Sequence, residues 1–83
     1  MPTIFRIDGL RVVIYPADHQ PAHVHVIGSG LEAIFNLQCP EGPPILRENN
    51  GFKSHELAPL AERLAVQLKA LCSQWRNIHG HYH

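Results

Sequence analysis

Residues 3–15 read TIFRIDGLRVVIY, in which two runs rich in β-branched residues flank the pair Asp8-Gly9. A two-residue type I′ turn needs positive φ at both positions, and an Asp-Gly pair adopts it at little steric cost. We therefore predict a β-hairpin that turns at this pair. Its register places four pairs opposite each other: Ile7 and Leu10, Arg6 and Arg11, Phe5 and Val12, and Ile4 and Val13.

Side chains alternate between the two faces of this hairpin. One face is apolar and is the predicted core face, with Phe5, Ile7, Leu10, Val12 and Ile14. The other face carries Arg6 directly opposite Arg11, and opposed like charges destabilise a strand pair. Either an acidic neighbour (Glu32, Glu48 or Asp8) neutralises the two guanidinium groups, or they form a site for an anion.

A second hairpin is predicted over residues 23–27 and 31–37, around Gly28-Ser29-Gly30. A two-residue turn at Ser29-Gly30 pairs Val26 with Ala33 and Val24 with Phe35, whereas a three-residue loop pairs Val26 with Glu32. The hydrophobic pattern favours the two-residue turn, because a one-residue slip would invert every side chain. This register sends a polar set to the face opposite the core: His23, His25, Glu32 and Asn36.

The rest of the chain predicts a loop and one helix. Residues 38–53 contain three prolines and two glycines, so we expect a loop with a brief edge strand near residues 45–47. Apolar residues at spacings of three and four predict a helix over about residues 55–78, with Ser54 as N-cap and Gly80 as its end. Residues 79–83 are expected to form a flexible tail. The predicted fold is a single-domain, two-layer α+β structure in which an antiparallel sheet of about four strands packs against that helix.

Charge and cysteine content restrict the class of protein. Seven basic and seven acidic residues give a net charge of zero, which disfavours a dedicated nucleic-acid binder. The two cysteines, Cys39 and Cys72, are too few for a disulfide framework and are expected to remain thiols. No apolar stretch is long enough for a membrane span, and the start MPTIFRIDG lacks an apolar signal core. We therefore expect a cytoplasmic protein with no membrane partner.

The densest set of chemically active side chains is DHQPAHVHV, residues 18–26. His23 and His25 are two residues apart on a predicted strand, so they point to the same side and suit a shared metal ion. Asp18 and His19 could add ligands or orient a ring. We therefore predict His19, His23 and His25 as candidate ligands of a divalent metal ion such as zinc, and His23 and His25 as candidate catalytic groups. The alternative is a polar sheet face that binds no ion.

The chain resembles a bacterial family of small domains of unknown function, family 4160, over nearly its whole length. The resemblance is carried by MPTIFR (residues 1–6), GLR (9–11), Tyr15, the DHxPxHVHV stretch from Asp18, LREN (46–49) and Gly51-Phe52. It implies a short cytoplasmic protein of no established activity, often encoded beside another small protein in an arrangement similar to a toxin–antitoxin pair. It further implies that the functional surface consists of the residues that match the motif, Asp18, His19, His23 and His25, together with Arg6 and Arg11.

These observations leave three hypotheses for function. The first is a protein-interaction module that binds a cognate small protein in a regulatory or toxin–antitoxin-like gene pair, or that self-associates to a homo-oligomer. Its predicted binding surface comprises Arg6, Arg11, Asp18, His19, His23, His25 and Glu32. The second is a metal-dependent or phosphate-directed enzyme, such as an RNA-cleaving toxin, that uses His23 and His25. The third is local nucleic-acid binding through Arg6, Arg11, Arg47 and Lys53, ranked last because the net charge is zero.

Overall fold

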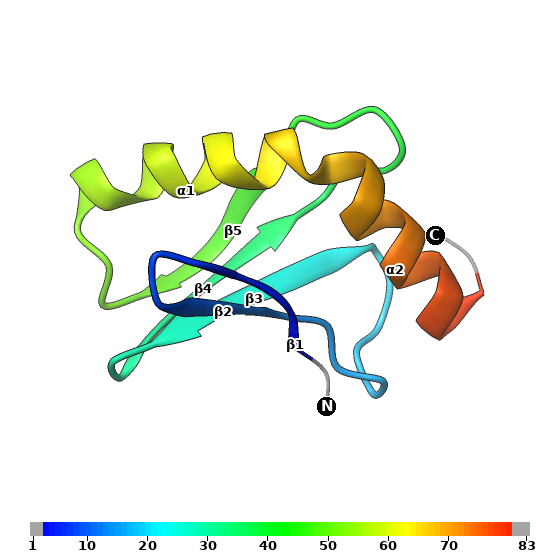
Figure 1. The fold of residues 1–83 in the computed structure, drawn as a ribbon, viewed down its shortest axis with the longest axis horizontal. Helices are drawn as coiled ribbons and strands as arrows, with labels where there is room; N and C mark the ends of the chain where they lie inside the picture. The colour runs from blue at the N-terminus through cyan, green and yellow to red at the C-terminus, as the bar shows by residue number, and fades with distance from the viewer. Residues whose placement is uncertain (1–2, 81–83) are drawn as a thin grey trace.

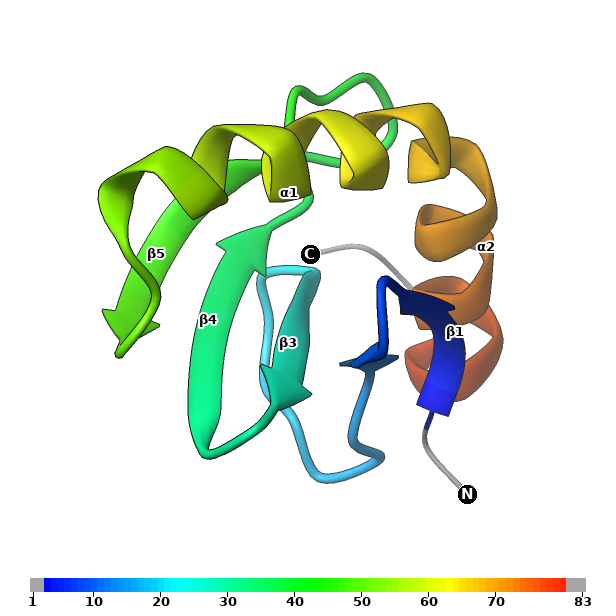
Figure 2. The ribbon, with the colours of Figure 1, turned by 60° about the vertical axis from the view of Figure 1, so that its left-hand side comes forward.

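The computed structural model describes residues 3–80, which form one antiparallel sheet of five strands and two helices. The strands are β1 (Thr3–Ile7), β2 (Leu10–Val13), β3 (His23–Gly28), β4 (Leu31–Asn36) and β5 (Ile45–Asn50), and they lie side by side in that order. The helices are α1 (Ser54–Val66) and α2 (Leu68–His79). Figure 1 shows α1 crossing above the sheet and α2 beside the end of the sheet where β3 begins, and Figure 2 shows the same two helices from the side.

The predicted α+β class is confirmed, but the numbers of strands and helices are wrong. The brief edge strand expected near residues 45–47 is present, but as β5 it extends to Asn50 and makes a full fifth strand within the predicted loop over residues 38–53. It is an edge strand whose six residues are all exposed, so it lacks the apolar alternation that marks a half-buried strand. The predicted single helix is two helices, because the chain leaves helical geometry at Gln67 (φ −99°, ψ 11°). The break lets α1 pack along the sheet while α2 covers its end.

The first hairpin has the predicted turn and, with one exception, the predicted register. Asp8 (φ 48°) and Gly9 (φ 83°) both have positive φ, as a type I′ turn requires. Three predicted pairs are present: Ile7 with Leu10, Arg6 with Arg11, and Phe5 with Val12. Beyond this point Thr3, not Ile4, lies opposite Val13, because the register shifts between Thr3 and Phe5. A β-bulge adds one residue to a strand, and here it allows Ile4 to pack against the core.

The second hairpin has the predicted two-residue turn. Ser29 (φ 50°) and Gly30 (φ 77°) form it, and the predicted pairs of Val26 with Ala33 and Val24 with Phe35 are present. Val24 and Val26 are fully buried. The intervening residues of β3, His23 and His25, are therefore placed on the opposite side of the strand.

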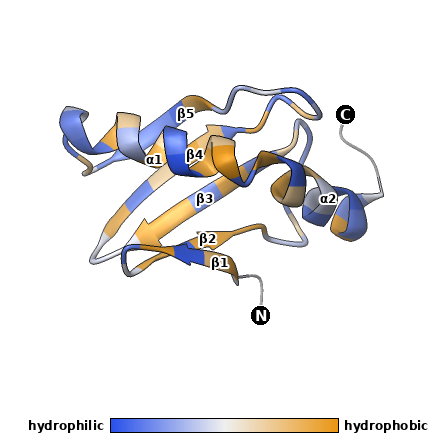
Figure 3. Ribbon diagram, turned by 45° about the horizontal axis from the view of Figure 1, so that its top comes forward, coloured by the Kyte–Doolittle hydropathy of each residue, from blue (hydrophilic) through white to orange (hydrophobic). Residues whose placement is uncertain are grey.

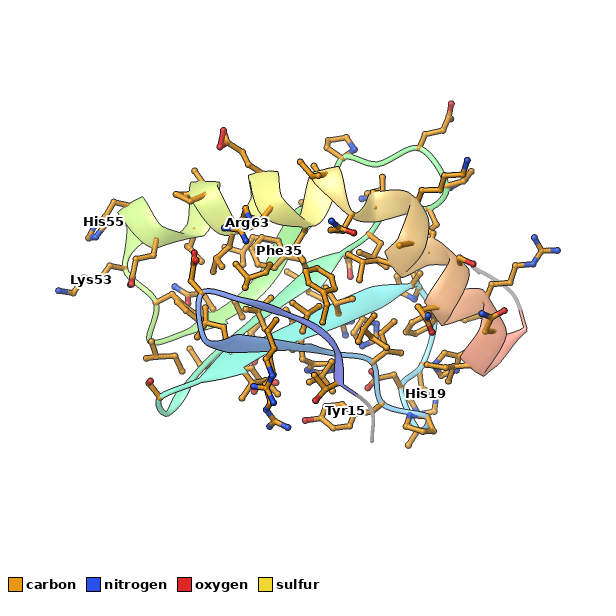
Figure 4. The ribbon with its side chains drawn as sticks, in the orientation of Figure 1. Tyr15, His19, Phe35, Lys53, His55 and Arg63 are labelled. Carbon is orange, nitrogen blue, oxygen red and sulfur yellow. A yellow bond between two sulfur atoms is a disulfide. The ribbon has the colours of Figure 1, made fainter. Side chains whose placement is uncertain are left out.

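The core lies between the sheet and the helices. Figure 3 shows hydrophobic residues gathered on the central strands, whereas β5 and the start of α1 are largely hydrophilic. Phe35 points from β4 into the space below α1 (Figure 4) and is 1% exposed. The helices contribute a buried set of apolar residues to the same core: Leu60, Leu64, Leu68, Leu71, Cys72 and Trp75.

The helical region begins one residue earlier than predicted and ends where predicted. The N-cap is Lys53, one residue before the predicted Ser54, and its backbone N–H donates to Oε1 of Glu56 at 2.8 Å. Gly80 ends α2 in the left-handed region (φ 85°), as predicted. His79 is the last residue of α2, and the rest of the predicted tail, residues 81–83, lies outside the described residues. Within residues 3–80, neither helix is long and apolar enough to cross a membrane.

Cys39 and Cys72 form a disulfide, so the prediction that they remain separate thiols is wrong. They are 33 residues apart in the sequence, and their Cα atoms are 5.8 Å apart. Both are buried, Cys39 in the loop after β4 and Cys72 in α2. No local motif marks this pair, because the two cysteines meet only when α2 folds back against that loop.

Replacing both cysteines by serine is expected to lower the free energy of unfolding by about 4 kcal/mol, the loop-closure estimate for this spacing. The bond restricts the unfolded chain, and Cys39→Ser/Cys72→Ser removes that restriction. Urea unfolding followed by circular dichroism measures the loss. A reductant should lower the urea midpoint of the unsubstituted protein and leave that of the double variant unchanged. Equal urea midpoints for the disulfide-bonded unsubstituted protein and the double variant would contradict the prediction.

Candidate functional site

Asp18, His23 and His25 form a compact group that we call the Asp-His cluster. One ligand atom from each residue lies within 4.8 Å of the others. Nε2 of His25 is 3.2 Å from Oδ2 and 3.3 Å from Oδ1 of Asp18. Nε2 of His23 is 3.5 Å from the same Oδ2. A single carboxylate therefore faces the outer nitrogen of both imidazole rings.

A tight turn between β2 and β3 holds the Asp18 carboxylate in this position. The backbone N–H of Asp18 donates to the carbonyl oxygen of Tyr15 at 3.0 Å, which closes a β-turn. The backbone N–H of Tyr15 in return donates to Oδ2 of Asp18 at 3.0 Å. Pro16 occupies the second position of the turn, where its fixed φ is favourable. The turn thus points the carboxylate at β3.

The other nitrogen of each ring is also occupied. Nδ1 of His23 lies 2.8 Å from the carbonyl oxygen of Pro21, and Nδ1 of His25 lies 2.8 Å from Oε2 of Glu32. A carbonyl or carboxylate oxygen can only accept here, so each Nδ1 carries the hydrogen and donates it. In the neutral ring this leaves a lone pair on Nε2. Metal-binding histidines have this arrangement, with the far N–H held by an oxygen acceptor.

The Asp-His cluster is largely removed from water. The side chains of His23, His25 and Asp18 are 6%, 12% and 14% exposed. A buried carboxylate is costly unless it is paired or bound to a cation. The two imidazoles are the only side chains within residues 3–80 that form ion-pair contacts with this carboxylate.

Aromatic rings enclose the cluster on two sides. The Tyr15 ring meets the His25 ring edge-on, with centroids 4.9 Å apart and planes at 71°. The Trp75 ring, from α2, lies 5.1 Å from the His23 ring. On α2 itself Trp75 stacks with His79 at 4.0 Å. The last helix therefore supplies one side of the site.

Three buried polar atoms near His23 have no hydrogen-bond partner within residues 3–80: Asn36 Oδ1, Trp75 Nε1 and His79 Nε2. Asn36 lies directly opposite His23 in the sheet, and the other two belong to the ring stack on α2. Buried polar groups are nearly always hydrogen-bonded, and exceptions commonly mark a bound water or ion.

The structure brings together some of the predicted metal and catalytic residues and not others. His23 and His25 are in the Asp-His cluster, and Glu32 holds His25. His19 is exposed and lies outside the cluster, on the outer side of the loop (Figure 4). The neighbouring residue Asp18 supplies the third ligand atom instead.

Arg6 and Arg11 lie opposite each other as predicted, but neither forms an ion pair within residues 3–80. Each acidic residue that could have neutralised them has another contact. Glu32 binds His25 at 2.8 Å, Asp8 lies 3.4 Å from Arg63, and Glu48 accepts from Asn50 at 2.9 Å. Within residues 3–80, none of these three carboxylates forms an ion pair with either arginine.

Four residues beside the Asp-His cluster are not among the predicted site residues: Tyr15, Asn36, Trp75 and His79. Strand alternation from the Asp8-Gly9 turn puts Tyr15 on the face of Arg6 and Arg11, and the second hairpin puts Asn36 beside the histidines, so a usable signal exists for both. Helical spacing predicts Trp75 in the core, where it is 0% exposed, and no sequence signal connects it to His23. His79 is part of the predicted tail.

A separate cavity of about 590 Å³ lies at the other end of the molecule, between the two hairpin turns and α1. Apolar side chains such as Ile7, Leu31 and Phe52 line it, and the Asp8–Arg63 pair lies among its lining residues. No residue of the Asp-His cluster lines this cavity.

Comparison with known proteins identifies a family. The model of a domain of unknown function, DUF4160, matches residues 9–76, a range that includes the whole Asp-His cluster and extends along α2 past Trp75. No curated protein and no solved structure matches the chain. The match covers most of the 83 residues, so the chain belongs to the DUF4160 family.

Proposed function

We propose that this protein binds a divalent metal ion of the zinc type through Nε2 of His23, Nε2 of His25 and the carboxylate of Asp18. One observation carries the proposal: both Nδ1 atoms face oxygen acceptors, and both Nε2 atoms face one buried carboxylate. In neutral rings whose Nδ1 carries the hydrogen, two Nε2 lone pairs converge on that carboxylate. Imidazole nitrogen and carboxylate oxygen are both common zinc ligands.

The separations between ligand atoms support an ion at this point. Ligands about 2.1 Å from a tetrahedral ion lie about 3.4 Å from one another. The two Nε2–Oδ2 separations are 3.5 Å for His23 and 3.2 Å for His25. Without a cation between them, a neutral Nε2 and a carboxylate oxygen are two acceptors and repel. A metal ion removes that repulsion for both rings at once, whereas protons would have to charge each ring separately.

Metal-dependent catalysis is a second candidate function, because the cluster offers three protein ligands. Zinc sites with three protein ligands keep a position for water or substrate, and structural zinc sites have four. Oδ1 of Asn36 can accept a hydrogen bond from such a water, and Nε1 of Trp75 can donate one to it; neither atom has a partner within residues 3–80. Arg6 and Arg11, on the same sheet face and without ion pairs in the described chain, suit a phosphate-bearing substrate. In this interpretation His23 and His25 are metal ligands, not acid–base groups.

Binding of a cognate small protein, in a regulatory or toxin–antitoxin-like gene pair, stays a prediction from the sequence, as does self-association. Location in the cytoplasm also stays a prediction. The two arginines would be the first residues to replace in a test of partner binding, since their charges are not satisfied within residues 3–80.

Zinc titration should show one site that depends on the Asp-His cluster. Asp18→Asn and His23→Ala should each weaken zinc binding more than about 100-fold, which exceeds the usual loss for a residue that only supports a ligand. Calorimetry measures the affinity. Ring ¹H–¹⁵N spectra should show Nε2 of His23 and His25 shifting while both Nδ1 atoms stay protonated. All proteins carry His81→Ala and His83→Ala, so that the terminal imidazoles cannot bind zinc.

Two exposed histidines serve as controls for this titration. His19 lies next to Asp18 in the sequence, and His55 lies at the opposite end of the molecule (Figure 4). His19→Ala and His55→Ala should leave the zinc affinity unchanged. The proposal is wrong if the oxidised background protein binds no zinc, or if His19→Ala weakens binding as much as His23→Ala does.

Glu32→Gln should weaken zinc binding about 10-fold, because it removes the negative charge that orients and polarises the His25 ring. The glutamine keeps an oxygen acceptor for Nδ1, so the sheet should remain folded. Glu48→Gln is the matched control. Glu48 lies on the next strand opposite Ile34, is exposed, and its side chain accepts a hydrogen bond from Asn50. Equal affinities for the two variants would show that the Glu32 charge does not act on the site.

A further inference from the structure

A single covalent bond connects the helix beside the Asp-His cluster to the loop after β4. Cys72 is in α2, and Cys39 lies three residues beyond Asn36, the last residue of β4. Trp75 follows Cys72 by three residues, so the two side chains share one side of the helix. Both are buried, with exposures of 2% for Cys72 and 0% for Trp75.

Trp75 is the residue through which α2 contacts the proposed metal site. Its ring lies 5.1 Å from the ring of His23, at an angle of 49°. On the other side His23 lies 5.3 Å from His25, so its ring is held between Trp75 and the second ligand. This packing leaves the His23 side chain only 6% exposed. Moving Trp75 away would admit water to the His23 ring and free its rotation.

Covalent and apolar contacts both attach α2 to the rest of the fold. The break at Gln67 separates α2 from α1, so the two helices are not one continuous helix. The disulfide joins α2 to the loop after β4, and buried side chains such as Leu68, Leu71 and Trp75 pack against the core. The covalent bond is placed between the break and Trp75, where it fixes the part of α2 that leads to the metal site.

We propose that the Cys39–Cys72 disulfide is a redox switch for the metal site, which binds tightly in the oxidised protein and weakly in the reduced protein. This inference rests on the proposed metal binding at the Asp-His cluster. Reduction releases α2 from the loop after β4, Trp75 withdraws from His23, and the ring is no longer held in the orientation that the ion requires. The loss should be about 10-fold, within the range for removing a group that supports a metal ligand.

A dithiol reductant supplies the electrons for this step. Its thiolate attacks Sγ of Cys39, the more exposed of the two cysteine residues, and the Cys39–Cys72 bond breaks with Cys72 as the leaving thiolate. The second thiol of the reductant then displaces Cys39 and closes a disulfide within the reductant. In total the protein disulfide takes up two electrons and two protons and becomes two thiols, while the dithiol is oxidised.

The test compares zinc affinity in the oxidised protein, the reduced protein and Cys39→Ser/Cys72→Ser, all with His81 and His83 replaced by alanine. Reduction uses a phosphine, which binds zinc weakly and becomes a phosphine oxide. The serine variant is needed because free thiols could themselves bind zinc. We expect about 10-fold weaker binding in the reduced protein and in the serine variant. Trp75 is the only tryptophan of the chain, so its fluorescence should shift to the red when α2 is released.

Two further variants test the route through Trp75 with the disulfide intact. Trp75→Leu should weaken zinc binding about as much as reduction does. Phe52→Leu is the matched control, because Phe52 is a buried aromatic residue that lines the cavity at the other end of the molecule. It should leave zinc affinity unchanged.

The outcomes separate this inference from the proposed function. If the oxidised protein binds no zinc, both fail. If the oxidised, reduced and serine proteins bind zinc equally tightly, metal binding stands and the switch is overturned. The switch is also overturned if Trp75→Leu has no effect, or if reduction abolishes the backbone ¹H–¹⁵N signals of β3 and β4, since it requires that only α2 be released.

Discussion

The alternation of side chains along β3 is the constraint on which both the core and the Asp-His cluster depend. Val24 and Val26 are fully buried against the helices, and His23 and His25 occupy the positions between them. The Ser29-Gly30 turn fixes this arrangement, because a one-residue slip would place the imidazoles in the core and the valines outside. The apolar residues of β3 therefore position the two histidines on the opposite side of the strand.

The parts of the fold that were predicted from the sequence are those with local causes. Both hairpin turns follow from residue pairs that tolerate positive φ; the first register follows from its turn and the second from apolar alternation. The parts that were wrong depend on distant contacts. The register of β1 shifts where Ile4 packs against the core, and β5 has no buried face that would mark its full length from the sequence. The helix breaks at Gln67 because its two halves cover different surfaces.

In the candidate site, too, the residues that were predicted have local sequence signals, and the others are placed by turns or distant contacts. The spacing of His23 and His25 was sufficient to predict two rings on one side of a strand. The choice between Asp18 and His19 depends on a turn in which Tyr15 and Asp18 bond each other reciprocally, and adjacent residues of such a loop point in different directions. Trp75 joins the site from the opposite end of the chain, so only the folded arrangement of α2 reveals it.

The end of the sheet where β3 begins is held together differently from the rest of the molecule. Apolar packing between the sheet and both helices stabilises the fold, and at this end a carboxylate, two imidazoles and a disulfide are added to it. Polar contacts of this kind contribute little net stability unless their charges are satisfied. An ion that binds only the folded arrangement would stabilise it by mass action. Metal binding and the Cys39–Cys72 bond would then both stabilise the same end of the sheet, which is the physical basis for coupling between them.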